Sequence, residues 1–446
     1  GAPRWAVGLG GLGADVARAI AVAPGAAIDG PADGKAVIAV AGYFDGEATF
    51  GALGARKSKG GTDAFVTALA ADGTPRWVQT FGSGRDDVAS GVAISKDGHV
   101  VVVGNFVDKM DVAGIKGQAA NSDDLYAAAF KPDGSPEWLW TAGGIDSDGA
   151  NCVAATPDGG WIIGGSFINE AKFGDTVFQS KGGGDAILAR LEPTGKVRWV
   201  QQLGGEYNDA IRSVAVDADG NLYLLAEFVD TATFGGEPLK NTGNAGADLA
   251  IVKLDGNGKH LWSRNLGSRL SDVAGTITVD ATGAVTVTGS FEGKLFAGSE
   301  QYAAVGQLDV LIAHYTADGT LAWVKTWGGE GTDIAGGVIA DASGNLFVTG
   351  WYEGAVLFGK TALASKGNRD VFAVKLSAAG EVQWAESFGD HDHDQGRAIA
   401  IDAHGNPVIT GVYRFAFDAV KPPLQSTRAP DDKLPKPDVF VLGLSK

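Results

Sequence analysis

Apolar and polar residues alternate along this chain in short segments that recur with a period of about 61 residues. Each copy has an apolar segment after an Asp, a second that ends in Gly-x-Phe or Gly-x-Tyr, a long polar stretch, a third that begins with Asp, and a fourth that carries a Trp. Alternating segments of this length, bounded by turns rich in Asp, Asn and Gly, predict β-strands. The fixed period indicates a repeat architecture.

One well-defined copy shows the expected strands. Its strands are predicted at residues 336–339, 346–352, 371–376 and 382–387, with a long crossing loop at 353–369. One tryptophan marks the fourth strand of every copy, where we expect it to pack between neighbouring sheets: Trp5, Trp77, Trp138, Trp199, Trp262, Trp323 and Trp384. Four strands in each copy predict an all-β fold, a seven-bladed β-propeller of four-stranded antiparallel blades that forms one domain over residues 1–446.

The two ends of the chain match parts of one repeat. Residues 1–5 match residues 73–77, and residues 438–444 match residues 63–69. The chain therefore begins with the fourth strand that its last copy lacks. We expect the N-terminal strand, from Arg4 to Leu9, to complete the last blade and close the propeller, which would remove an open sheet edge.

Composition narrows the classes of partner. The net charge is −17, the pI is about 4.7 and no cluster of Lys and Arg is visible, so nucleic acid and anionic membrane surfaces are poor partners, and we expect neither nucleic-acid binding nor membrane insertion. No apolar run reaches the length of a membrane span. The single cysteine, Cys152, allows no disulfide within the chain and is expected to be a buried, inert thiol. The chain has no initiator Met or leader, which suggests a processed or trimmed sequence.

Two segments carry a resemblance to a known family: residues 213–223, which read SVAVDADGNLY, and residues 370–376, which read DVFAVKL. Together with the trailing Trp, they resemble the bacterial SBBP-type β-propeller repeat over the whole chain. The resemblance implies a seven-bladed propeller from a secreted or cell-surface bacterial protein, and it brings no shared catalytic residues. The second copy departs most, at residues 107–114, so its long loop is expected to differ in shape.

Two aspartates recur in every copy. The first set precedes the innermost strand: Asp15, Asp87, Asp148, Asp209, Asp272, Asp333 and Asp394. The second begins strand three: Asp63, Asp124, Asp185, Asp248, Asp309, Asp370 and Asp438. Both sets should lie on one face. We interpret them as structural, because an Asp at the start of a strand accepts hydrogen bonds from loop amides. The alternatives are binding of calcium or another divalent cation, and catalysis, which is disfavoured because every copy offers the same environment.

Positions where the copies differ are better candidates for recognition. The residue before the aromatic at the end of strand two varies around the repeats: Tyr43, Asn105, Ser166, Glu227, Ser290, Trp351 and Val412. We expect Tyr43, Glu227, Trp351 and its neighbour Tyr352 to bind a ligand, since large aromatics stack on sugars or hold peptides. The competing interpretation is that Trp351 packs beneath its own loop.

One loop has the composition of a metal site. Residues His391, Asp392, His393 and Asp394 supply ligand types that suit a divalent transition metal, although a solvated polar loop is the alternative. The turn at residues 217–221 resembles the start of a calcium loop but is explained by β-turn chemistry. No cofactor is required by any motif, and no hydrolase, zinc-protease, P-loop or dinucleotide signature is present.

These observations favour a binding role without catalysis. The leading hypothesis is an exported or cell-surface scaffold that recognises a protein or glycan partner through the face bearing the aspartates. The alternatives are a structural subunit of a bacterial surface assembly and, less favoured, an enzyme that uses the central funnel. Insertions at residues 24–35 and 415–437 are additional candidate contact surfaces. The sequence leaves the oligomeric state open.

Overall fold

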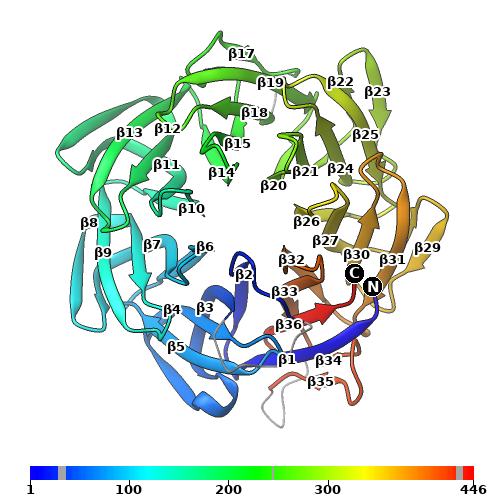
Figure 1. Cartoon of the computed structure of the whole chain (residues 1–446), viewed down its shortest axis with the longest axis horizontal. Helices are drawn as coiled ribbons and strands as arrows, with labels where there is room; N and C mark the ends of the chain where they lie inside the picture. Colours follow the sequence, from blue (N-terminus) through cyan, green and yellow to red (C-terminus); the bar gives the residue numbers. More distant parts are fainter. Residues whose placement is uncertain (29–36, 244–245, 428–434) are drawn as a thin grey trace. The chain divides into compact units, whose positions relative to one another are not determined.

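The chain is all-β and folds into two compact units (Figure 1). The computed structural model describes residues 1–28, 37–243, 246–427 and 435–446. Unit 1 comprises residues 1–150, 366–371 and 387–446, and unit 2 comprises residues 151–365 and 372–386. The insertions expected at 24–35 and 415–437 lie partly outside the described residues, and their role as contact surfaces stays a prediction.

Unit 1 contains three antiparallel sheets of four main strands each, and a short pairing of the N-terminal strand joins the first and third of them into one eight-stranded sheet. The first two are β2 (Val16–Val22), β3 (Ile38–Thr49), β4 (Ala55–Leu69) and β5 (Pro75–Phe81), then β6 (Val88–Ile94), β7 (Val100–Val112), β8 (Ile115–Phe130) and β9 (Pro136–Gly144). A 3-10 turn, η1 (Gly51–Leu53), separates β3 from β4.

The third sheet of unit 1 joins the two ends of the chain. Its order is β32 (Gln395–Ile401), β33 (Pro407–Tyr413), β36 (Asp438–Leu444) and β1 (Pro3–Gly11), with a small hairpin of β34 (Ala416–Phe417) and β35 (Leu424–Gln425). β1 pairs antiparallel with β36 from Pro3 opposite Leu444 to Leu9 opposite Val439. The N-terminal strand therefore occupies the fourth position of the sheet formed by the C-terminal strands, as its sequence predicts.

Unit 2 repeats the same arrangement, apart from a few end residues of β10, β30 and β31 that belong to unit 1. Its strands, in chain order, are β10 (Gly149–Ala155), β11 (Trp161–Phe173), β12 (Thr176–Leu191) and β13 (Val197–Gly205); β14 (Ala210–Val216), β15 (Leu222–Phe228), β18 (Asp248–Leu254) and β19 (His260–Ser268); β20 (Val273–Val279), β21 (Val285–Phe291), β24 (Asp309–Tyr315) and β25 (Leu321–Trp327); and β26 (Ile334–Ala340), β27 (Leu346–Tyr352), β30 (Asp370–Leu376) and β31 (Val382–Phe388). The first strands of successive sheets pack together, β14 on β20 and β20 on β26 (Figure 1).

The long polar stretch of each repeat forms a β-hairpin, which corrects the prediction of a crossing loop. In unit 2, separate short strands form three such hairpins: β16 (Thr231–Thr233) with β17 (Leu239–Lys240), β22 (Lys294–Ala297) with β23 (Glu300–Ala303), and β28 (Ala355–Phe358) with β29 (Thr361–Ala364). In unit 1, β34 and β35 form another. Elsewhere strands two and three simply continue into the hairpin. The second repeat, expected to differ, forms this continuous hairpin between β7 and β8, just as β11 and β12 do.

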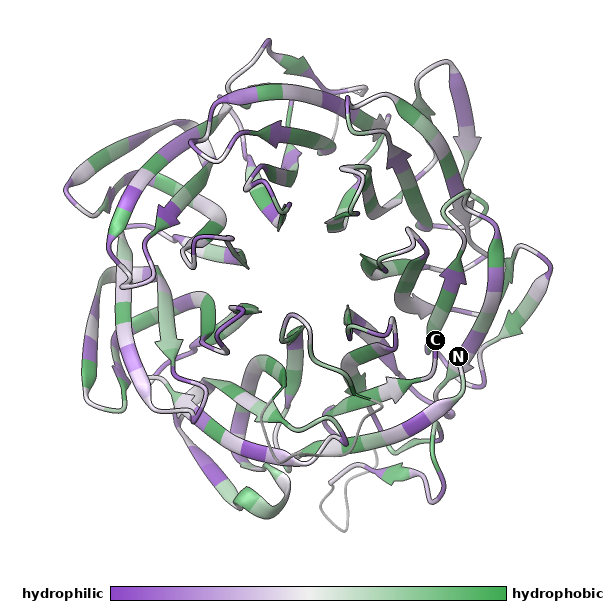
Figure 2. Cartoon of the chain, in the orientation of Figure 1, coloured by the Kyte–Doolittle hydropathy of each residue, from purple (hydrophilic) through white to green (hydrophobic). Residues whose placement is uncertain are grey.

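The middle strands supply the apolar core. In β15 and β27 nearly every residue is buried, and their side chains pack in separate clusters with the strands of adjoining sheets. Figure 2 shows hydrophobic colour concentrated on the middle strands of the sheets and a mixture of hydrophobic and hydrophilic colour on the fourth strands and hairpins. Strands buried on both faces read as continuous apolar runs because both sides meet other sheets. Cys152 is buried, as predicted, and burial raises the pKa of its thiol to about 12, which disfavours the reactive thiolate.

The repeated tryptophans pack against turns of the following sheet. Trp77 Nε1 donates a hydrogen bond to the Pro132 carbonyl at 3.0 Å, and Trp262 Nε1 donates to the Ala317 carbonyl at 3.2 Å. The turn glycines beside these two rings have φ near +80°, and a Cβ on Gly134 or Gly319 would lie 2.6 or 2.7 Å from the indole. None of the seven repeated tryptophans is exposed, so the prediction that they pack between sheets is confirmed for these pairs.

Candidate functional site

The first set of repeated aspartates organises the loops that lead into the innermost strands. All seven are buried, and in each case one carboxylate oxygen accepts a hydrogen bond from the backbone N–H four residues earlier, at 2.5–2.9 Å. Their own N–H groups donate to carbonyls near the start of strand three, as Asp333 does to Leu308 at 2.7 Å. The structural interpretation of this set is therefore supported by its contacts.

The second set holds the neighbouring hairpin. Each carboxylate accepts a hydrogen bond from a backbone N–H of the segment before strand three, at 2.6–3.3 Å, as in Lys59 to Asp63 and Thr427 to Asp438. All seven are buried. The two sets thus fix the two segments that meet at one end of every sheet.

Members of the two sets lie close together in pairs. A Cβ on Gly10 would lie 2.5 Å from Asp438 Oδ1 and 2.9 Å from Asp15 Oδ2, and a Cβ on Gly82 would lie 2.7 Å from Asp63 Oδ1. This close approach explains the Gly-rich sequence that follows each repeated Trp. A buried carboxyl beside another carboxyl resists ionisation, so we expect these pairs to bind protons more tightly than an exposed Asp does.

Burial is the main cause of the raised pKa of these carboxyls. It raises the pKa of Asp15 to about 8, with a further contribution from Asp438, and raises the pKa of Asp394 to about 8. For Asp209 and Asp272 the pKa is raised to about 7. Within the described part of the chain, the Oδ1 atoms of Asp15 and Asp438 are buried and have no hydrogen-bond partner, so a proton on Asp15 that is shared with Asp438 would satisfy both.

We predict that the free energy of unfolding falls as pH rises from 5 to 9. A folded-state pKa above the ordinary value means that the folded chain binds more protons, so this contribution is complete below about pH 4 and is lost as pH rises through 6 to 8. Each pKa unit between the folded and the unfolded state corresponds to about 1.4 kcal/mol, so the free energy of unfolding should fall by several kcal/mol. Urea unfolding across this pH range measures it.

Asp15→Asn should flatten this pH dependence, because the amide mimics the protonated carboxyl. Asp133→Asn is the matched control, since Asp133 is an exposed turn residue whose pKa is lowered by hydrogen bonds from Ser135. A wild-type stability that rises between pH 5 and 9 would contradict the assignment of neutral carboxyls.

The four residues expected to bind a ligand have different environments. Tyr43 is half-buried at the end of the main part of β3, with the Arg18 guanidinium 5.3 Å from its ring centre. Glu227 is engaged, because its carboxylate accepts two bonds of 2.8 Å from Arg212 and one of 2.8 Å from the Ala274 N–H.

The other two of these residues are adjacent in β27. Trp351 is half-buried opposite Ile334, whereas Tyr352 is fully buried in the core. Tyr352 therefore cannot reach a ligand from solvent, which corrects its place among the expected binding residues.

The sequence did not reveal a β-bulge in the innermost strands. The pairing register skips one residue, three positions after the first-set Asp, in most of these strands. The residues at this offset differ between repeats: Arg18, Ser90, Asn151, Arg212, Gly275, Gly336 and Arg397. Bulges redirect a side chain away from the ladder and are frequent at binding sites. In the sequence, the bulge is marked by a position that varies between repeats and lies three residues after a repeated Asp.

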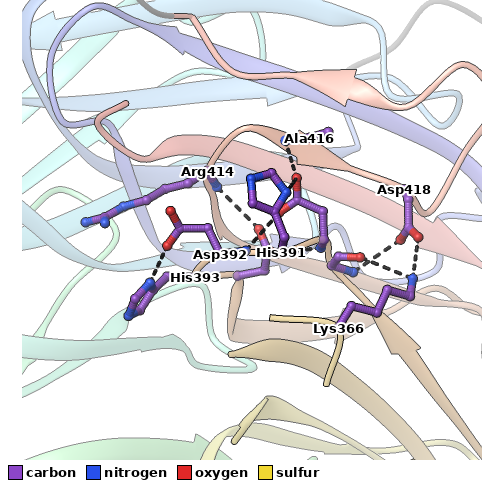
Figure 3. A network of polar contacts seen from close by, with 10 residues as sticks. Lys366, His391, Asp392, His393, Arg414, Ala416 and Asp418 are labelled. Carbon is purple, nitrogen blue, oxygen red and sulfur yellow. Dashed lines mark hydrogen bonds and ion pairs between the residues drawn. The ribbon is translucent and has the colours of Figure 1, made fainter. Parts of the chain in front are cut away.

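The loop before β32 forms a polar network, but it does not gather its histidines (Figure 3). His391 contacts Asp390 at 3.2 Å and packs near Phe415, with ring centres 4.7 Å apart. His393 pairs with Asp392 instead. Asp394 is buried and accepts bonds from the N–H groups of Asp390 and Arg414.

A nearby cation in the same network is Lys366. Its ammonium group pairs with Asp418 and donates a hydrogen bond to the Gly389 carbonyl at 3.2 Å (Figure 3). Within residues 1–28, 37–243, 246–427 and 435–446, no group of three or more His, Cys, Asp or Glu side chains is arranged to hold a metal ion. The structure thus does not bring His391, Asp392, His393 and Asp394 into one coordination sphere.

Two cavities of unit 2 were not predicted. One, of about 350 Å³, lies beside the turn at residues 217–221, whose Asp217 is engaged by Asn221 and by the Tyr223 hydroxyl. These bonds agree with the β-turn interpretation of that segment. The other, of about 280 Å³, is lined by residues that include Lys181 and the exposed Tyr207.

In the part of the chain that the structure describes, no helix has the length and apolar character to cross a bilayer.

Comparisons with known proteins give partial likenesses. No family model matches the chain, so the SBBP resemblance rests on the repeat residues alone. The regulatory protein FlaEY of Caulobacter vibrioides is 29% identical over 232 residues, which cover 49% of this chain and 23% of that protein. An uncharacterised WD repeat-containing protein of Acanthamoeba polyphaga mimivirus is 24% identical over 196 residues, which cover 37% of this chain and 14% of that protein.

Among solved structures, the neighbours are β-propeller proteins. One is YCF48 bound to D1 peptide, with 9% identity, a TM-score of 0.43, and coverage of 100% of this chain and 96% of that chain. Another is the calcium-binding protein regucalcin of Agrobacterium tumefaciens, with 13% identity, a TM-score of 0.29, and coverage of 96% of each chain. The chain spans less than a quarter of the length of both curated relatives described above.

Proposed function

We propose that the chain is a seven-bladed β-propeller, closed by β1, that serves as a binding scaffold rather than an enzyme. Three four-stranded sheets in unit 1 and four in unit 2 support the count of seven, and the pairing of β1 with β36 supports closure. The partner is a protein or a glycan, and we place the scaffold outside the cell or on its surface.

The proposal rests on one observation: residues with backbone contacts recur between the repeats, whereas residues at strand ends and bulges vary. The first-set aspartates accept the same backbone hydrogen bond in every repeat, and Trp77, Trp262 and Trp323 each donate to a turn carbonyl of the following sheet. Variation is concentrated at the ends of strand two and at the bulges, as at Tyr43, Trp351 and Arg18. Loops and strand ends on a rigid scaffold are where binding residues usually lie. The first-set aspartates accept an equivalent backbone hydrogen bond in every repeat, which suits a structural role better than acid and base catalysis.

A binding array tests the proposal. Protein and glycan arrays should be read with the intact chain, once with calcium and once with a chelator, to identify the partner and any need for a cation. For a partner found in this way, Tyr43→Ala and Trp351→Ala should each weaken binding by roughly tenfold or more, because aromatic anchors carry much of an interface's energy.

Lys131→Ala and Glu192→Ala are the controls, since both residues are exposed in the turns that follow strand three, at the end opposite the repeated aspartates. They should bind as the wild type does. Loss of binding in these turn variants, with retention in Tyr43→Ala and Trp351→Ala, would show that the opposite face is used.

A further inference from the structure

Two arginines of unit 1 occupy the same structural position on adjacent inner strands. Arg18 is the residue skipped by the ladder between Ala17 and Ala19 of β2, and Arg397 is the one skipped between Gly396 and Ala398 of β32. The two strands pack against each other. Because a bulged residue is left out of the pairing pattern, its side chain is free to point away from the regular alternation of the strand.

In unit 2 a carboxylate neutralises the charge of the equivalent arginine, which distinguishes it from Arg18 and Arg397. Arg212 occupies the same bulge of β14 and forms two bonds of 2.8 Å with Glu227, at the end of the next strand. The position of Glu227 is taken by Tyr43 in the sheet of Arg18 and by Val412 in the sheet of Arg397. Within the described residues, no ion pair with a carboxylate is formed by either arginine.

Arg397 also has an unused donor. Its Nη2 donates to Gln395 Oε1 at 2.9 Å, but its Nε–H is buried and has no hydrogen-bond partner among the residues that the structure describes. Leaving a charged donor buried and unpaired costs more than leaving a neutral one, so a ligand that accepts from it would gain stability. The Arg18 guanidinium lies over the Tyr43 ring, which holds it near the same place without neutralising its charge.

The nearest repeated carboxyls do not supply the missing charge. Asp15 and Asp394 lie three residues before the two arginines and accept bonds from the N–H groups of Gly11 and Asp390. Burial raises the pKa of each to about 8, so both are largely neutral at pH 7.

The two arginines are also close enough to repel each other. Burial and the charge of Arg18 lower the pKa of the Arg397 guanidinium, while Tyr43 acts in the opposite direction. Two like positive charges therefore lie together in a chain whose net charge is −17. An anion between them would relieve this repulsion.

We propose that Arg18, Arg397 and Tyr43 form a binding site for one oxyanion group, a carboxylate, sulfate or phosphate carried by a ligand. Guanidinium groups bind such groups through paired N–H donors, and the Tyr43 hydroxyl adds a neutral donor. This inference deepens the proposed function by naming the chemistry of the ligand, and it rests on that function only for the identity of the molecule that carries the anion.

Small anions test the site without any macromolecular partner. Thermal unfolding of the intact chain at pH 7 should be followed with increasing sodium sulfate, phosphate or acetate, with sodium chloride adjusted to hold the ionic strength constant. A ligand that binds only the folded state stabilises it by RT ln(1 + [L]/Kd), so the rise of the midpoint with anion concentration gives an apparent Kd. A response to sulfate and phosphate alone, or to acetate alone, supports the site and identifies the class of anion.

The variants separate a site from a general salt effect. Arg18→Gln should weaken the apparent Kd on the order of tenfold or more, since a charge-assisted bond is removed at an exposed position. Arg212→Gln is the matched control at the equivalent bulge and should respond as the wild type does. If Arg397→Gln fails to fold, Arg397→Lys keeps the charge but loses the paired donors and should also weaken binding.

Three results would overturn the inference: no midpoint shift with any of the anions in the wild type, an unchanged shift in Arg18→Gln, or an equal loss in Arg212→Gln. A failed partner search on the arrays would leave this result unaffected, so the two proposals can fail separately.

Discussion

Deleting residues 1–10 is expected to abolish cooperative unfolding and to cause aggregation. β1 covers β36 along its length, from Pro3 opposite Leu444 to Leu9 opposite Val439. Every residue of β36 is buried, so removing β1 exposes an apolar strand edge that can pair with other molecules. Loss of a sharp transition in urea or heat, with oligomers in light scattering, is the measurement.

A peptide of residues 1–12, added to the truncated chain, provides the matched rescue and should restore a cooperative transition. Arg4→Ala serves as a control within β1, because Arg4 is exposed and its replacement leaves the pairing intact. A truncated chain that melts at the wild-type temperature without aggregation would show that β1 is dispensable.

Trp262→Ala is expected to lower the free energy of unfolding by about 3 to 5 kcal/mol, the usual cost of emptying a buried aromatic site. Trp262 is 9% exposed, packs in a core cluster with Ile251, Leu266 and Ile277, and donates a hydrogen bond to the Ala317 carbonyl. Urea unfolding measures the loss. Trp262→Phe keeps an aromatic ring but removes the donor, so it should cost less than Trp262→Ala.

Leu261→Ala is the control for that substitution, because Leu261 is adjacent in sequence and 48% exposed. Its effect should stay within about 0.5 kcal/mol, as is usual for surface substitutions. An equal loss in Leu261→Ala and Trp262→Ala would contradict a specific packing role for the indole.

The main strands could be predicted from the sequence because their pattern is repeated and is bounded by turn residues. Residues 346–352 are predicted as one strand and form β27 with those bounds. The roles of the repeated aspartates and tryptophans also follow from their recurrence, since a residue needed by every sheet must occur in every copy. Pairing of the two chain ends was readable because residues 438–444 lack a following strand in their own copy.

Other features of the structure are harder to predict from the sequence. The outer hairpins, such as β28 with β29, have strands of four residues, too short to separate from a polar loop by alternation. The buried position of Tyr352 depends on which face of β27 meets the next sheet, and the separate partners of His391 and His393 depend on loop geometry. Neither the burial of Tyr352 nor the separate partners of the two histidines can be derived from the order of residue types along the chain.

The bulge of the innermost strands has a consequence for how such a protein can change over time. The residue at this position has no partner in the pairing register of the strands, as at Arg18, Ser90 and Gly336. Substitutions there should therefore leave the strand pairing intact. At exposed bulges, such as that of Arg18, charge, size and polarity can therefore vary without loss of strand pairing. New ligand preferences can arise by single substitutions at these sites, without compensating changes elsewhere in the sheets.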